Sequence, residues 1–500
     1  MRLKKIVLFV LLLFNCSVVF AQFKLSGKIK NYLGKEELKI NIPLVFGFYK
    51  ENSIAIPVAK DGSFAMVLNI DKAKFANLIF QRTFHTLLLH KGKDLTIEIN
   101  EKDSTVSLKS GTALPENKVM QVADIEQYPF FLINEGKAFS GLSLAALRAQ
   151  VVAPYFAQRD EKIKKVMASG IANKDKLLIA AELKYIAFNY LNDLARTQLS
   201  NRLVVDSLVI EIFNASNPVP DTWPAGPQYF AFVDNYVRYL ETKAFAIVKK
   251  DSIKPNQPIP YYGISLDSAN IAYSKYGKPY LRWISVSKNF SAPVAIAYNY
   301  QQLIKLYQDK DLRQFEGLYQ SFKNKFPANV YQKDMDGKLT SLKNTLIANQ
   351  RNPNIKIIDG YSQVESIYDV VKNYKGKVIY LDIWGTWCGP CKEELGYVPE
   401  LKAHFKGKNV VFIYLDMDEE DKDSSWKEFI KTNNMEGIHL RKNRQTIAPI
   451  WKELLVNAED KEQYYPQYFI FDKDGKLAVT KANRPSSKVE LYTQLERYLK

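Results

Sequence analysis

The chain has 500 residues, of which 47% are hydrophobic and 13% aromatic, enough for the cores of about three domains. This composition, with 22 Gly and 21 Pro, excludes a fibrous, low-complexity or disordered protein. The formal net charge is +17, but residues 355–500 contain 23 Lys and Arg against 23 Asp and Glu. The positive excess therefore lies upstream, where basic residues spread among apolar ones indicate a solvated face, which could lie near an anionic envelope surface, rather than a phosphate-reading element.

Residues 1–21 have the pattern of an export signal. Basic residues come first, an apolar run follows over 6–14, and the last three residues, ending in Ala21, fit a small-x-small cleavage site. The run is shorter than the roughly 20 residues that a membrane-spanning helix needs. We therefore expect an exported chain in the periplasm or cell envelope. A lipid anchor on Cys16 is the less favoured alternative, because Asn15 is not the small residue that usually precedes a lipidated cysteine.

Residues 22–118 predict a small antiparallel, β-sandwich-like domain. Apolar and polar residues alternate, for example over 23–29 and 95–99, and turn residues separate the runs. His85 and His90 lie five residues apart on a candidate strand, so they would face opposite sides and could not share a metal without a bulge. We interpret both as ordinary surface or edge histidines.

Residues 119–350 predict a helical region, because apolar residues recur there every three or four positions. Two such stripes are Ile179, Leu183, Ile186, Tyr190 and Leu194, followed by Phe230, Val233, Val237 and Leu240. Proline-rich segments at 218–227 and 255–260 should separate helices. Aromatic residues crowd the end of the region, and their helical spacing favours core packing over a ligand groove. They include Tyr298, Tyr300, Phe315, Tyr319 and Phe322.

Residues 355–500 predict an α/β unit with a mixed sheet, after a polar linker at 351–354. The expected strands are 377–384, 410–417, 438–440, 468–471 and 477–480, with a hairpin turn at 473–475. The expected helices are 389–405, 424–432, 446–455 and a last one from residue 486.

Beyond residue 21 the chain has only two cysteines, Cys388 and Cys391. A bridge between them would close a very small loop and add little stability, which favours a reactive pair over a structural one. They lie where a buried strand gives way to a helix, so free backbone N–H groups favour a thiolate at Cys388, the expected nucleophile. Pro390 suits the first helical turn, and Cys391 is placed to attack a mixed disulfide formed at Cys388.

The segment from Asp382 to Glu394, which contains Trp-Cys-Gly-Pro-Cys, resembles the thioredoxin fold and is most similar to exported TlpA/ResA-type disulfide reductases. The resemblance implies that Asp382 assists proton transfer at Cys391 and that Glu394 tunes the thiols. The alternatives are a solvated strand-end carboxylate for Asp382 and a helix-surface charge for Glu394. The Gly-Pro dipeptide between the cysteines is that of reducing thioredoxins, so we expect disulfide reduction.

The resemblance also implies a cis-proline facing the dithiol, for which Pro466 is the candidate. Together with Trp387, Gly389, Pro390 and Tyr465 it would form the surface that binds client proteins. Tyr465 departs from the family's usual aliphatic residue or threonine, which leaves the client preference open. The expected partners are client proteins with disulfides and a membrane thiol-transfer protein that supplies electrons.

Alternative functions remain open at this point. A structural zinc needs four ligands, and the cysteine pair has only His404 and His439 to add, so we expect neither metal nor cofactor. The protein could instead be chiefly a module that binds or organises the envelope, or a disulfide isomerase. Nucleic acid is not an expected partner of an exported chain, and the sequence leaves the oligomeric state undecided.

Overall fold

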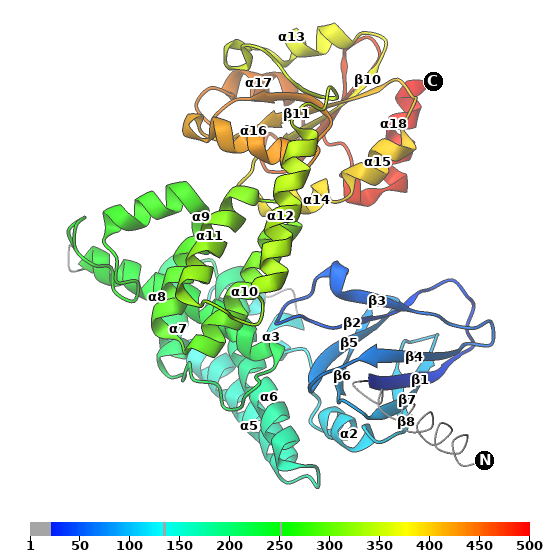
Figure 1. Ribbon diagram of the computed structural model, residues 1–500, viewed down its shortest axis with the longest axis vertical. Coiled ribbons are helices and arrows are strands. Elements are labelled where there is room, and N and C mark those ends of the chain that lie inside the picture. Colours follow the sequence, from blue (N-terminus) through cyan, green and yellow to red (C-terminus); the bar gives the residue numbers. More distant parts are fainter. Residues whose placement is uncertain (1–21, 134–136, 251–252) are drawn as a thin grey trace, which may run out of the picture. The chain divides into compact units, whose positions relative to one another are not determined.

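The computed structural model describes residues 22–133, 137–250 and 253–500. The chain has β sheets in its N-terminal part, helices in its middle part and an α/β region at its C-terminal end (Figure 1). These are the three regions that the sequence predicts. The proposed signal segment, including Cys16, lies outside the described residues. None of the described helices combines the length and the apolar character that crossing a membrane requires.

The N-terminal region contains eight strands in two four-stranded sheets, with the orders β4-β1-β7-β8 and β3-β2-β5-β6. The strands are β1 (Gln22–Lys30), β2 (Leu38–Asn41), β3 (Ser53–Ile56), β4 (Ser63–Asn69), β5 (Lys74–Phe80), β6 (Thr83–Leu89), β7 (Asp94–Asn100) and β8 (Val106–Ser110). Neighbouring strands run antiparallel, except that β1 and β7 run parallel. Apolar residues of both sheets, such as Leu25 and Leu78, share one buried core, as the alternating pattern requires.

His85 and His90 do not come together in this region. His85 lies beside the carbonyl oxygen of Ser104, at 2.7 Å from its Nε2. His90, only 6% exposed, lies 3.3 Å from the carboxylate of Asp175 and 3.7 Å from that of Glu116. The prediction of a surface or edge position is therefore wrong for His90, because two helices cover the end of its strand.

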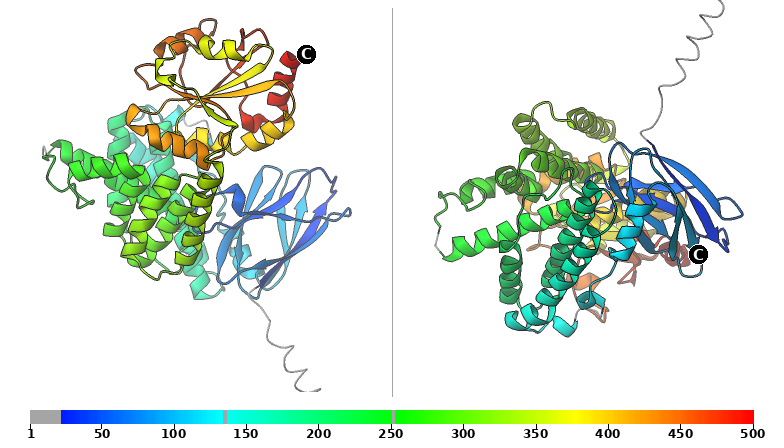
Figure 2. Two further views of the ribbon diagram at one scale, coloured as in Figure 1. Left: turned by 45° about the horizontal axis from the view of Figure 1, so that its top comes forward. Right: turned by 90° about the horizontal axis from the view of Figure 1, so that it is seen from below.

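The middle region consists of helices. They contain the predicted apolar stripes, and the predicted proline-rich segments lie between them. They are α2 (Leu114–Val122), α3 (Phe130–Ile133), α4 (Leu144–Leu147), α5 (Ala153–Met167), α6 (Asn173–Asp193), α7 (Arg202–Asn214), α8 (Pro227–Lys250), α9 (Leu266–Asn289), α10 (Ala292–Gln308), α11 (Leu312–Lys325) and α12 (Gln332–Asn349). Helices α5, α6, α7 and α8 pack against one another (Figure 2). Both proline-rich segments separate helices, since α8 begins at Pro227 and α9 begins beyond Pro260.

The stripe residues are buried, apart from half-buried Ile186 and Tyr190. The aromatic residues at the end of the region behave in the same way, because only Tyr300 among the five is not fully buried. Core packing, the favoured interpretation of their spacing, is confirmed for the other four.

The chain folds into two compact units. The first extends to Ile271 and includes Leu281–Gln301, whereas the second comprises Ala272–Tyr280 and Gln302–Lys500. Helix α9 contributes to both, and its Gly277 interrupts the helix with a left-handed φ of 76°. Helices α11 and α12 therefore belong to the same unit as the C-terminal α/β region.

The C-terminal region is built on a six-stranded mixed sheet with the order β14-β13-β10-β11-β12-β9. Its strands are β9 (Ile355–Ile357), β10 (Val378–Trp384), β11 (Val410–Asp416), β12 (Gly437–Arg441), β13 (Gln467–Phe471) and β14 (Leu477–Val479). Its helices are α13 (Ile367–Val371), α14 (Gly389–Leu395), α15 (Val398–His404), α16 (Asp423–Thr432), α17 (Ala448–Leu454) and α18 (Val489–Leu499). The central strand β10 is buried along its whole length, between parallel β11 and antiparallel β13.

Two expectations about this region need correction. The single helix expected over 389–405 is in fact two, because α14 ends at Leu395 and Pro399 opens the first turn of α15. Proline lacks a backbone N–H and therefore suits the start of a new helix. In addition, β9, the strand at one edge of the sheet, was not predicted.

Residues 351–354 join α12 to β9 and are hydrogen-bonded to the segment between α16 and β12. The Asn352 side chain donates to Asn434 and Glu436, at 2.8 and 3.1 Å. The carbonyl oxygen of Asn354 accepts from the backbone N–H of Gly437 at 2.8 Å. The segment that the sequence marks as a linker is thus attached to the sheet it precedes.

Candidate redox site

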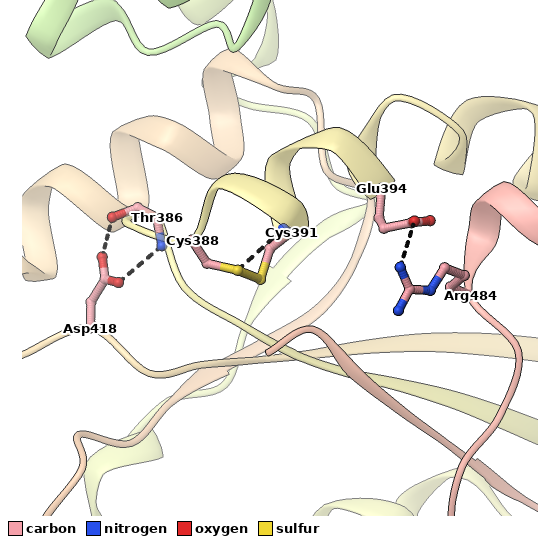
Figure 3. The surroundings of a disulfide bond; sticks show 6 residues. All are labelled: Thr386, Cys388, Cys391, Glu394, Asp418 and Arg484. Carbon is pink, nitrogen blue, oxygen red and sulfur yellow. Dashed lines mark hydrogen bonds and ion pairs between the residues drawn. A yellow bond between two sulfur atoms is a disulfide. The ribbon is translucent and has the colours of Figure 1, made fainter. Parts of the chain in front are cut away.

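Cys388 and Cys391 form a disulfide at the start of α14, with their Cα atoms 5.2 Å apart (Figure 3). Strand β10 ends at Trp384, and a short turn leads to Cys388, which is the N-cap residue of the helix. Its sulfur accepts the backbone N–H of Cys391 at 3.2 Å. Cys388 is 4% and Cys391 2% exposed. Backbone donors at this helix end favour negative charge on the Cys388 sulfur once the bond is reduced.

Asp382 lies on β10 and is only 4% exposed, so a solvated strand-end carboxylate is the wrong interpretation. Its Oδ1 has no hydrogen-bond partner. Burial, assisted by the nearby carboxylate of Glu394, raises the pKa of Asp382 well above its ordinary value. Asp382 therefore binds a proton more tightly than an exposed aspartate does, and it lies on the strand that leads into the cysteine-containing turn and helix.

Glu394 is also buried, which excludes the interpretation as a helix-surface charge. Its carboxylate accepts hydrogen bonds from the backbone N–H of Ser486 at 2.9 Å and from the Ser486 hydroxyl at 2.8 Å. The guanidinium of Arg484 lies 3.7 Å away (Figure 3). These contacts tie the end of α14 to the segment before α18.

The sequence analysis missed Asp418, whose carboxylate holds the turn before Cys388 (Figure 3). It accepts the backbone N–H of Thr386 at 3.0 Å and also the Thr386 hydroxyl. Burial raises the pKa of Asp418, and it raises that of neighbouring Asp416 well above the ordinary value. A signal existed for both, because Asp416 ends β11 and Asp418 follows it, and adjacent parallel strands bring their carboxyl ends to one edge of the sheet.

Lys392, the residue after Cys391, makes a second contact that the sequence did not reveal. Its ammonium donates to the carboxylate of Asp311 at 2.9 Å. Asp311 caps α11 in the helical region and lies 81 residues away along the chain. Nothing in the local sequence around either residue indicates this pair.

The residues expected to bind clients lie around the disulfide at different depths. The Tyr465–Pro466 peptide bond is cis, as the resemblance predicts. Tyr465 packs against the buried cluster that includes both cysteines, and Pro466 is buried. Trp387 is 49% exposed, with its ring edge-to-face on Tyr465 at 5.4 Å, and Gly389 and Pro390 are exposed beside it.

A guanidinium also contacts the ring pair of Trp387 and Tyr465. The side chain of Arg444 lies over the Trp387 ring at 5.2 Å from its centroid. Arg444 follows β12 and is exposed, so it belongs to the same solvent-facing rim as Trp387. The sequence analysis did not single it out.

The two histidines considered as zinc ligands contact other residues. His404 lies 3.0 Å from Glu496 and stacks on Tyr492. His439 is buried, stacks on Tyr414 and makes a ring-nitrogen contact with a backbone carbonyl, and burial lowers its pKa to about 4. In the part of the chain that the structure describes, no group of three or more His, Cys, Asp or Glu side chains is arranged to hold a metal.

The C-terminal region is similar to several known proteins. Residues 348–495 match the Redoxin family. The thiol-disulfide oxidoreductase ResA of Bacillus thuringiensis subsp. konkukian (strain 97-27) is 34% identical over 131 residues, which are 26% of this chain and 66% of that protein. ResA of Bacillus subtilis (strain 168) is 30% identical over 97 residues, 18% of this chain and 53% of that protein. The match thus spans about two thirds of the first relative and about half of the second.

Among solved structures, the thioredoxin domain of a thiol-disulfide oxidoreductase from Bacteroides vulgatus is similar, with 21% identity and a TM-score of 0.21. The similarity covers 26% of this chain and 84% of that one. A thiol:disulfide interchange protein from Chlorobium tepidum TLS has 15% identity and a TM-score of 0.22, over 26% of this chain and 84% of its own.

Proposed function

Since residues 348–495 form a domain of the Redoxin family, we propose that the protein is a thiol-disulfide oxidoreductase that acts through Cys388 and Cys391. The observation that carries the proposal is the disulfide between these cysteines at the start of α14. The relatives named ResA support the same class of activity for the C-terminal region.

In the reducing direction, the Cys388 thiolate attacks one sulfur of a client disulfide and displaces the other as a thiolate. The resulting mixed disulfide is then attacked by Cys391, which must first lose its proton. This second step forms the Cys388–Cys391 bond and releases the client with two thiols, so the client gains two electrons. Asp382 is the buried group proposed to take the proton, because its raised pKa makes its carboxylate a stronger base than that of an exposed aspartate. Glu394 is proposed to tune this site through its interaction with Asp382.

The direction and location of the reaction are part of the proposal. The Gly389-Pro390 dipeptide supports reduction, and the signal-like segment at 1–21 supports export to the periplasm or envelope. There a membrane thiol-transfer protein would return electrons to the disulfide. Clients would bind at Trp387, Tyr465 and cis-Pro466.

We also propose a role for each domain that the sequence predicts. Residues 22–118 and 119–350 would form two accessory regions that select or position clients. Residues 355–500 would form the catalytic domain. The alternative of an isomerase is distinguished by refolding of a scrambled disulfide substrate, which a simple reductase does not reshuffle to the native form.

The variant Cys391→Ser tests the proposal, because it removes the thiol that resolves the mixed disulfide. We expect this variant to form covalent adducts with disulfide-containing proteins that disappear on treatment with dithiothreitol. Cys388→Ser is the matched control and should form no adducts of this kind. Wild-type protein should also accelerate insulin reduction by dithiothreitol. Absence of both adducts and insulin reduction would overturn the proposal.

A further inference from the structure

Lys392, the residue that follows Cys391, carries a buried charge. It lies in α14, and its side chain is 10% exposed. Its ammonium donates to Asp311 at 2.9 Å and lies over the ring of Phe429, which packs in the same cluster as both cysteines. Buried charges in proteins are normally paired, and the pairing here comes from the helical region rather than from the α/β region.

Three carboxylates act on this ammonium. Asp311 is the one in hydrogen-bond contact, with a side chain 9% exposed, while Asp309 and Asp418 act at longer range. Burial opposes the charge of Lys392, but the carboxylates outweigh it, so the pKa of Lys392 is raised and the ammonium persists. Asp311 is the one of the three within hydrogen-bond distance, so it offsets the charge of Lys392 most strongly.

The carboxylate of Asp311 also caps α11, where it accepts the backbone N–H of Gln314 at 3.2 Å. Asparagine is as good an N-cap residue as aspartate. The variant Asp311→Asn can therefore remove the negative charge and retain the hydrogen bond that begins the helix. This separates the electrostatic role of the residue from its structural role.

We propose that Asp311 is a positioning residue for the dithiol, which holds the Lys392 side chain, offsets its charge and thereby sets the redox equilibrium of Cys388 and Cys391. The inference rests on the proposed redox function. Reduction of the disulfide takes up two electrons with two protons to give two thiols, or with one proton when one sulfur remains a thiolate. An uncompensated ammonium at Lys392 would stabilise the thiolate and so favour the reduced form.

The experiment equilibrates full-chain variants with glutathione, in which two glutathione molecules supply two electrons and two protons and become glutathione disulfide. The fraction of reduced protein is read from alkylation and mass spectrometry. For Asp311→Asn we expect a shift toward the reduced form of about tenfold in the equilibrium constant, or about 30 mV for this two-electron couple. Lys392→Met should shift the equilibrium the opposite way. The double variant should return close to wild type, and Asp311→Glu should preserve the wild-type equilibrium.

The matched control is Glu316→Gln, on the same helix. Glu316 pairs with Lys343 at the surface, with side chains 48% and 47% exposed, and its loss should leave the equilibrium unchanged. Circular dichroism verifies that each variant is folded. If Asp311→Asn fails to fold, the test uses Lys392→Met only. A redox equilibrium of Lys392→Met equal to that of the wild type then overturns the inference.

Two further outcomes are decisive. Shifts of the same sign in Asp311→Asn and Lys392→Met would overturn the inference, because general damage to the site would then explain them. If the wild-type cysteines exchange with glutathione but neither variant shifts the equilibrium, only this inference fails. If the wild-type cysteines do not exchange at all, the proposed function itself fails.

Discussion

Two buried carboxyl groups near the disulfide differ in their hydrogen bonding. Glu394 receives two hydrogen bonds from Ser486, whereas Oδ1 of Asp382 receives none. An ionised carboxylate without donors is costly to bury, so Asp382 is the group whose proton affinity is raised. Such a perturbed acid beside a reactive disulfide is typical of a functional position that reduces stability.

The variant Asp382→Asn should stabilise the oxidised protein at neutral pH and slow its reaction. Burial raises the pKa of Asp382 in the folded state, so the folded chain retains a proton that the unfolded chain releases above about pH 4. Stability of the wild type therefore falls as pH rises from that value toward the folded-state pKa. We expect urea unfolding to show a gain of about 1–3 kcal/mol for the variant at pH 7, shrinking at pH 4.

The same variant should reduce insulin more slowly, because asparagine cannot accept a proton from Cys391. Asp359→Asn, at an exposed position before α13, is the control for the loss of one negative charge. Equal stability of Asp382→Asn and wild type at both pH values would contradict the argument.

The sequence predicts those site residues that a short stretch of neighbouring sequence identifies. The motif around Cys388 and Cys391 and the proline at 466 are local, and their disulfide and cis bond follow the resemblance. Asp418 could have been found from its place after a parallel strand. Asp311 could not, because its partner lies 81 residues away and no periodicity connects α11 with α14.

At the scale of elements, two glycines should respond in opposite ways to replacement by alanine. Gly27 lies in β1, where a Cβ atom would be 2.1 Å from the carbonyl oxygen of Ile97 in β7 and 2.7 Å from the ring of Phe64. Gly337 lies in α12 with no atom within 4 Å of the corresponding position. We expect Gly27→Ala to destabilise by about 1–3 kcal/mol through overpacking. Gly337→Ala should stabilise by about 0.5–1 kcal/mol, because glycine is unfavourable inside helices.

Thermal unfolding by calorimetry measures both effects, and each variant serves as the control for the other. A Gly27→Ala variant as stable as the wild type would contradict the close approach of β1 to β7, and a loss of stability in Gly337→Ala would contradict the open space at that position of α12.

The predicted strands of the C-terminal region agree with the structure to within two residues, because long runs of buried residues leave a clear pattern. The break between α14 and α15 was missed although Pro399 marks it, since proline is disfavoured inside a helix and suits a first turn. Strand β9 has three residues, too few for alternation to be visible, whereas the equally short β14 was predicted because a hairpin turn precedes it. The β domain was recognised from its alternation, but alternation carries no information about strand direction, and so the parallel pair β1–β7 was not foreseen.

At the scale of the whole molecule, the uneven distribution of charge predicts binding to anionic surfaces. Residues 355–500 are neutral, so the positive excess of the chain lies outside them. We expect the protein without residues 1–21 to sediment with phosphatidylglycerol vesicles but not with phosphatidylcholine vesicles. Binding should be strong at about 10 mM salt and lost near 1 M, where the screening length falls from about 30 Å to about 3 Å. Equal sedimentation with both lipids at low salt would contradict this expectation.

The hydrogen bonds of residues 351–354 determine where a fragment that contains the C-terminal α/β region should begin. Because Asn352 and Asn354 are bound to the segment that leads into β12, a fragment starting at residue 355 would lose the anchors that hold the short edge strand β9. It would also lack the aspartate that faces Lys392. The natural place to divide the protein is therefore upstream of α11, so that Asp311 and residues 351–354 stay with the sheet.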